Sequence, residues 1–202
     1  MARTARKTDT SVELLEAAKK ALRQNGYAKL STRQVAAEAG VPLSQIHYHF
    51  GSKQGLVLAL FEYLNGQLLD RQSAMFDNPA LSLSEKWALA CDYLDEDIRS
   101  GYVRILQELI AASWSDAGVA KVVRAALMGW IPLITAAARQ AEGKLSLGNF
   151  TPEEVGTLVA NAFIGAESLH LLGFEAKGFP VRQALRRVGE LIGAVETKPS
   201  KG

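Results

Sequence analysis

Apolar residues recur at intervals of three and four along almost the whole chain, and no stretch alternates apolar and polar residues for long. This spacing is typical of helices that bury one face, and it argues against β-sheet. Turn-forming residues interrupt the pattern and divide it into about nine helices. Because we find neither an internal repeat nor a low-complexity segment, the sequence predicts an all-α globular fold.

Capping residues locate the ends of several helices. Thr10 with Glu13, and Ser31 with Gln34, each have the spacing of a capping box, and Ser52 can cap a fourth helix. Later helices are expected at about 82–99, 102–114, 117–141, 151–172 and 180–195. The helix after residue 150 has the clearest start, a Thr cap followed by Pro and two Glu in Thr151-Pro152-Glu153-Glu154.

Composition excludes several classes of protein. The hydrophobic content of 48% and charged content of 22% are those of an ordinary globular chain. Cys91 is the only cysteine, so no internal disulfide can form, which fits a reducing cytoplasm. Three scattered histidines beside one cysteine predict no zinc site, and we expect no cofactor.

Neither a membrane span nor a secretory leader is expected. The longest uncharged run, Ala125 to Ala138, is shorter than the roughly 18 residues that a membrane helix needs, so a buried core helix is the better interpretation. The basic start of the chain is not followed by an apolar run, unlike a signal peptide. We therefore expect a cytoplasmic protein with no membrane partner.

The positive charge is concentrated at the N-terminus. Residues 1–53 hold nine Lys/Arg and four Asp/Glu, a net charge of +5, whereas the rest of the chain carries −3. A basic head on an acidic body suggests a polyanionic partner for the head. Chance variation in surface charge explains the asymmetry equally well, so only the local motifs of the head can distinguish it from a polyanion-binding surface.

The head has the pattern of a helix-turn-helix. Two short helices joined by the turn Gly40-Val41-Pro42 follow a longer supporting helix. In that motif the second short helix enters the major groove of DNA, and the first crosses the backbone. The groove-facing helix would present polar side chains, and the residues expected to contact DNA are Ser31, Thr32, Arg33, Leu43, Ser44, Gln45, His47, Tyr48, His49 and Lys53.

Thr10 to Leu64 resembles the DNA-binding domain of the TetR family of repressors. The resemblance lies in the segment LSTRQVAAEAGVPLSQIHYHFGSKQGL, with its Ser-Thr-Arg, Ala-Gly-Val turn, aromatic HYHF and Ser-Lys. It implies backbone contacts from Thr32, Tyr48 and Lys53. Base or groove contacts are implied for Arg33, Leu43, Ser44, Gln45 and His49. The chain departs from the family at His47, where Tyr is usual, and at Pro42, where Ser is frequent.

The basic arm at residues 1–9 has two interpretations. Arg3, Arg6 and Lys7 would reach a minor groove or phosphates if the arm binds DNA. A solvent-exposed tail is equally consistent with the sequence.

The last two helices are apolar over a wide arc, more than one side of a monomer core requires. TetR-like proteins pair these helices into a dimeric four-helix bundle, so the resemblance implies a homodimer on a palindromic operator. Packing within one chain is the alternative. The expected interface residues are Val155, Val159, Phe163, Leu185, Val188 and Ile192.

The middle helices are expected to hold a small-molecule effector, as the resemblance implies. Glu167 and His170 lie one helical turn apart, so they are expected to hydrogen-bond each other without a ligand. Gln107 and Asn161 are further polar candidates. The expected pocket residues, each also consistent with plain core packing, are Trp87, Cys91, Leu106, Leu109, Trp114, Met128, Trp130, Ile134, Phe163, Glu167 and His170.

These observations divide the chain into a DNA-binding domain at 1–54, a helical ligand-binding and dimerisation domain at 55–197, and a tail at 198–202. No catalytic triad, phosphate loop or nucleotide fingerprint occurs, so an enzyme is not expected. The sequence predicts a transcriptional repressor that a largely apolar small molecule releases from double-stranded DNA. The alternative is a helical module that binds DNA without sequence preference, or that binds protein.

Overall fold

The computed structural model describes residues 9–25, 29–141 and 149–196, and over these ranges the chain is all-α, as predicted. Arg3, Arg6 and Lys7 of the arm, and the tail from 198, lie outside them. The helices are α1 (Thr10–Asn25), α2 (Thr32–Glu38), α3 (Ser44–Phe50), α4 (Lys53–Phe76), α5 (Leu83–Ser100), α6 (Tyr102–Ser113), α7 (Ala117–Ala141), α8 (Pro152–Leu171), the short 3-10 helix η2 (Phe174–Lys177) and α9 (Val181–Glu196).

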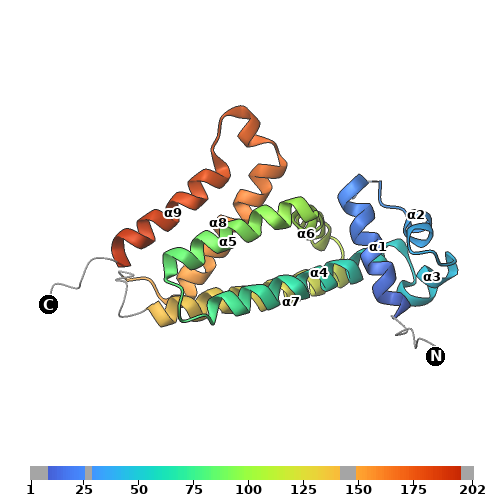
Figure 1. Ribbon diagram of the computed structural model, residues 1–202, viewed down its shortest axis with the longest axis horizontal. Coiled ribbons are helices and arrows are strands. Elements are labelled where there is room, and N and C mark those ends of the chain that lie inside the picture. The colour runs from blue at the N-terminus through green and yellow to red at the C-terminus, as the bar shows by residue number, and fades with distance from the viewer. Residues whose placement is uncertain (1–8, 26–28, 142–148, 197–202) are drawn as a thin grey trace, which may run out of the picture.

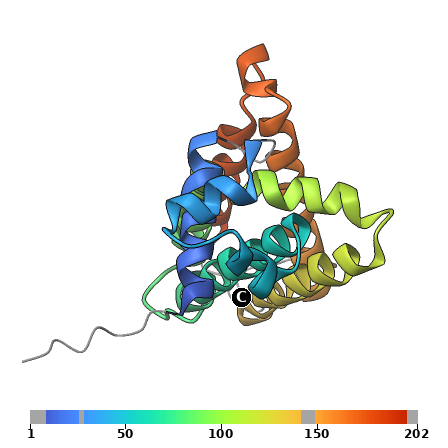
Figure 2. The ribbon, with the colours of Figure 1, turned by 90° about the vertical axis from the view of Figure 1, so that its right-hand side faces the viewer.

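The first three helices form a small head at one end of an elongated helical body (Figure 1). Helix α4 leaves the head and runs through the body beside α7, so one continuous helix connects the two parts. Helix α8 packs on α7, and α9 packs on α5. The segment that joins α8 and α9, which contains η2, projects away from the body (Figure 2).

Two apolar clusters hold this arrangement together. The larger one joins the head to the near part of the body, and it contains Leu14, Ile46, Phe61 and Tyr102. The smaller one lies deeper in the body around Phe163. Because the larger cluster is continuous from α1 to α7, the head cannot change its tilt without repacking side chains of α4 and α6.

Local capping explains most of the helix starts. The Ser31 hydroxyl accepts from the backbone N–H of Gln34 at 3.3 Å, and Ser52 caps α4 in the same way. Thr151 and Glu154 form the complete capping box that the sequence predicts.

The prediction that Thr10 caps the first helix is wrong. Thr10 is already helical, and the carboxylate of Asp9 accepts a hydrogen bond from the backbone N–H of Ser11 at 3.0 Å. Asp is as good a cap as Thr, and its negative charge also favours the N-terminus of a helix.

Among the described residues, α7 alone has the length and apolar content of a membrane span, with a mean hydropathy of 1.5 over its most apolar window. It is not isolated, because it packs against α4, α6 and α8. Core helices of globular proteins have the same composition, so this feature is weak evidence for a membrane.

Candidate nucleic-acid interface and body cavities

A tight turn fixes the angle between α2 and α3. Gly40 adopts a left-handed conformation with φ of 67°, and the N–H of Val41 donates to the carbonyl of Ala36 at 3.0 Å. Val35 on α2 and Ile46 on α3 are fully buried against the supporting helices. The turn and these two anchors hold α3 with its opposite face toward solvent.

The outward face of α3 is polar and aromatic. Ser44 and His47 are exposed, Tyr48 is 81% exposed, and Gln45 and His49 are half-buried. An aromatic side chain this exposed contributes nothing to the core of the monomer, so it is available to a partner. Leu43 differs from these residues, because it is half-buried and packs against the larger cluster.

His47, which stands where the family usually has Tyr, makes a local contact. Its Nδ1 donates to the carbonyl oxygen of Gly51 at 3.3 Å. This bond stabilises the left-handed end of α3 at Gly51, where φ is 73°. The other ring nitrogen of His47 stays available on the exposed face.

The phosphate-binding candidates surround α3. Ser31, Arg33 and Lys53 are exposed, and Thr32 is half-buried at the first turn of α2. Between Lys29 and Lys53 the sequence has one carboxylate, Glu38, which pairs with Lys20. The face around α3 therefore carries little negative charge to repel a polyanion.

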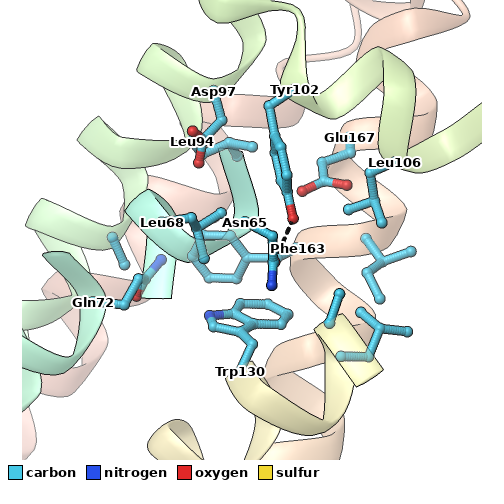
Figure 3. Close-up of a pocket in the computed structure, with 14 residues that line it drawn as sticks. Asn65, Leu68, Gln72, Leu94, Asp97, Tyr102, Leu106, Trp130, Phe163 and Glu167 are labelled. Atoms are coloured by element: carbon cyan, nitrogen blue, oxygen red, sulfur yellow. Dashed lines mark hydrogen bonds between the residues drawn. The ribbon is translucent and has the colours of Figure 1, made fainter. Parts of the chain in front are cut away.

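The body contains two adjoining cavities that share Gln72, Ala90, Trp130 and Phe163 as walls. The first, shown in Figure 3, has a volume of about 40 Å³ and lies between α4, α5, α6, α7 and α8. Its remaining wall residues are Asn65, Leu68, Leu94, Asp97, Tyr102, Leu106, Ala126, Leu127, Ile164 and Glu167.

The second cavity has a volume of about 170 Å³ and is almost entirely apolar. Trp87 and Trp130 both pack edge-on against Phe163, at centroid distances of 5.5 and 5.9 Å, and form its aromatic wall. Its remaining wall residues are Phe76, Leu83, Lys86, Ile134, Ala137, Ala138, Ala141, Val155, Val159 and Ile192.

Glu167 is the most deeply buried carboxylate of the first cavity. Burial raises its pKa to about 7, although a hydrogen bond from Gln107 Nε2 at 2.9 Å opposes the rise. Ser168 donates to the other end of the Gln107 amide, which fixes the orientation of that amide. Burial also raises the pKa of Asp97, at the other side of the cavity, to about 6, although its ion pair with Arg71 opposes the rise.

The predicted pair of Glu167 with His170 is wrong. Nδ1 of His170 donates to Glu175 at 2.9 Å, and Glu175 also binds Arg182. Glu167 is bound by Gln107 on α6, which lies far away in the sequence, and His170 is bound by Glu175, which lies beyond the end of α8. The one-turn spacing therefore does not bring the side chains of Glu167 and His170 together.

The expected pocket residues fall into two groups. Trp87, Leu106, Trp130, Ile134, Phe163 and Glu167 line one or both cavities. Cys91 and Leu109 are buried among core side chains, Trp114 and Met128 are exposed, and His170 is half-buried in the ion pair with Glu175.

Lys86 and Gln72 are wall residues that sequence reasoning missed. The sequence pattern could have identified both, because each is a polar residue within the apolar stripe of its helix. Lys86 precedes Ala90 and Leu94 at four-residue steps on α5, and Gln72 follows Leu68 by the same step on α4.

The outer face of α8 and α9 exposes several large apolar side chains in the single chain. Val155, Val159, Phe163, Leu185 and Ile192 point inward or are half-buried, so of the six expected interface residues only Val188 is exposed. The apolar side chains that do face solvent on this side are Leu158, Leu169 and Leu172, together with Val188, Leu191 and Val195.

Residues 14–60 match the model of the family described as bacterial regulatory proteins, tetR family. The chain is 38% identical over 69 residues to the HTH-type transcriptional regulator CymR of Pseudomonas putida, a match that covers 34% of each protein. The chain thus spans about a third of the length of that relative.

Solved structures resemble the whole chain in fold. A TetR transcription regulator from Haloarcula marismortui ATCC 43049 has a TM-score of 0.73 at 18% identity, covering 92% of this chain and 97% of that one. The regulator FadR from Bacillus subtilis, in complex with stearoyl-CoA, has a TM-score of 0.69 at 16% identity, covering 93% and 99%.

Proposed function

We propose that this chain is a TetR-family transcriptional regulator, and not an enzyme, and that it represses transcription by binding a palindromic operator as a homodimer. The observation that carries the proposal is the exposed polar face of α3 on a head with little negative charge. Gln45 and His49 would contact base edges, and Lys53 would bind a phosphate. We assign residues 1–54 to DNA binding and 55–197 to effector binding and dimerisation.

The dimer would form through the outer face of α8 and α9. Leu158 on α8, Leu172 directly after α8, and Leu191 on α9 are each at least half exposed in the single chain. A two-fold pairing of this face removes it from water, and it would place two copies of α3 about one DNA turn apart. That spacing is why we expect a palindromic operator.

The effector would be a small, largely apolar molecule bound in the two cavities. Tyr102 and Trp130 line the first cavity, and Tyr102 also belongs to the cluster that includes the head. A ligand that enlarges the cavity would therefore favour the state in which the two copies of α3 are wrongly spaced for the operator. We expect a cytoplasmic protein, as befits a DNA-binding regulator.

A mobility-shift assay on DNA that flanks the protein's own gene tests operator binding. The wild type is expected to bind one fragment with an inverted repeat more tightly than random DNA of equal length. Gln45→Ala should weaken binding to that fragment about tenfold or more, because the amide can no longer hydrogen-bond a base edge. Lys53→Ala should weaken binding to all fragments, since one phosphate is no longer neutralised. It should also make the slope of log affinity against log salt concentration less steep by about one.

Lys177→Ala is the matched control, because Lys177 is exposed on η2, away from the head. It should leave the shift unchanged. Equal affinity for the inverted repeat and for random DNA would instead favour the alternative, a helical module that binds DNA without sequence preference.

A further inference from the structure

The second cavity has one charged side chain in an apolar wall. Of its wall residues only Lys86 is ionisable. Gln72 is the one other wall residue whose side chain has a polar group without a hydrogen-bond partner. The indole N–H of Trp87 is engaged, because it donates to the carbonyl of Leu185 at 2.8 Å. A lone ammonium in such a wall defines one polar end for whatever fills the cavity.

Lys86 is 8% exposed, and no carboxylate of the described residues lies within 4 Å of its ammonium group. Its Nζ donates to the carbonyl oxygen of Phe76, the last residue of α4, at 2.6 Å. This bond uses one of three N–H donors, and the C-terminus of a helix supplies only a partial negative charge. Buried charges are normally paired, so Lys86 lacks a full counter-charge within the described chain.

Gln72 supplies a second polar group at the same cavity. It is 6% exposed, and its Oε1 has no hydrogen-bond partner in the described residues. A buried amide whose oxygen is unpaired is not held by the protein's own hydrogen bonds, in contrast to the Gln107 amide. The amide of Gln72 is therefore free to turn its N–H groups toward a ligand.

We propose that the second cavity binds an organic carboxylate with a compact apolar body. The carboxylate would pair with Lys86 and accept from Gln72, and the body would lie against Trp87, Trp130 and Phe163. This inference rests on the proposed effector function and specifies its ligand class. The carboxylate group is what distinguishes this ligand from a purely apolar one.

Calorimetric titration of the full-length protein with three small molecules that share the same hydrocarbon skeleton tests the inference. The probes are 4-phenylbutanoate, 4-phenylbutan-1-ol and 4-phenylbutylamine, which differ only in the head group. The wild type should bind the carboxylate at least about tenfold more tightly than the alcohol, because a charge-assisted hydrogen bond at a buried ammonium in an apolar wall is strong. Lys86→Met should abolish that preference and leave the alcohol affinity unchanged within about twofold.

Lys86→Arg keeps the charge, so it should keep the preference for the carboxylate, and it remains informative if the Met variant does not fold. Lys177→Met is the matched control and should bind like the wild type. Equal or tighter binding of the alcohol overturns the carboxylate inference but leaves an apolar effector in place.

Tightest binding of the amine overturns it in favour of a cationic ligand at Glu167 in the adjoining cavity. Failure of all three probes to bind also overturns it. None of these outcomes bears on operator binding, which the mobility shift tests separately. Release of the operator by the carboxylate in that assay would show that the bound acid acts as an effector.

Discussion

The ring of Tyr102, at the start of α6, lies flat against the ring of Phe61 on α4, with centroids 5.5 Å apart and an interplanar angle of 8°. Tyr102 also lines the first cavity, whereas Phe61 is fully buried in the cluster that reaches the head. One stacked pair thus connects the cavity to the packing that positions α3. Next to it, Gly101 approaches Leu22 of α1 so closely that a Cβ would lie 3.1 Å from that side chain.

Removing this stack should uncouple effector binding from DNA binding. Tyr102→Leu deletes the ring contact, so a bound effector should release the operator less completely than it does in the wild type. Tyr102→Phe keeps the stack and loses only the hydrogen bond to Asn65, at a cost of about 1 kcal/mol in the free energy of unfolding. A mobility shift with and without effector compares the two, and equal release in both variants would contradict the role of the stack.

Glu167 should make the protein less stable as the pH rises. Its pKa is near the ordinary value in the unfolded chain and about 7 in the folded one, so the folded state binds the proton more tightly between these values. The contribution of Glu167 to stability is therefore greatest below its unfolded pKa and is lost as the pH rises through about 7. Glu167→Gln removes this titration and keeps an acceptor for Gln107. Urea unfolding should show the variant gaining about 2–3 kcal/mol on the wild type between pH 5 and pH 8.

A constant difference between the two proteins over that pH range would contradict the raised pKa of Glu167. The comparison between variants matters because Asp97, whose pKa is also raised, titrates in both proteins, so most of its contribution cancels in the difference. The part that remains reflects the charge of Asp97, which itself helps to raise the pKa of Glu167.

Cys91 should be unreactive in the folded protein. It is buried, and burial raises the pKa of its thiol to about 11. Only about one thiol in a thousand is then ionised at pH 8, and the thiolate is the reactive form. Ellman's reagent should detect no thiol in the native protein and one per chain in guanidinium chloride. Rapid reaction of the native protein would show that Cys91 is accessible.

A charge on the outer face of α9 should break the dimer. Leu191 is 69% exposed in the single chain, so Leu191→Glu leaves the core intact but would bury two unpaired carboxylates in the proposed interface. Analytical ultracentrifugation should find a monomer that is still helical, and its operator affinity should fall at least about 100-fold. Lys177→Glu, an exposed change on η2, should stay dimeric.

If Leu191→Glu instead sediments as the wild type does, the face formed by α8 and α9 is not the interface. If the wild type itself is monomeric at the concentrations at which it binds DNA, the proposal of a palindromic operator fails with it.

Much of the head was predictable because it depends on neighbouring residues. Ser31 and Ser52 cap their helices through bonds to residues three positions away, and Gly40 takes the left-handed conformation that a turn requires. The body was less predictable. On α8 both Phe163 and Leu158 belong to apolar stripes, but Phe163 faces the core and Leu158 faces solvent.

The amino-acid sequence by itself determined the helices of the head, their order and the polar character of α3, since these follow from hydrogen bonds and periodicity within a few residues. Only the tertiary structure decided that Glu167 meets Gln107 and not His170, and that Lys86 faces an apolar cavity. Those contacts join residues of different helices, and the rotation of each helix is set by the packing of all its neighbours at once, which periodicity along one helix does not record.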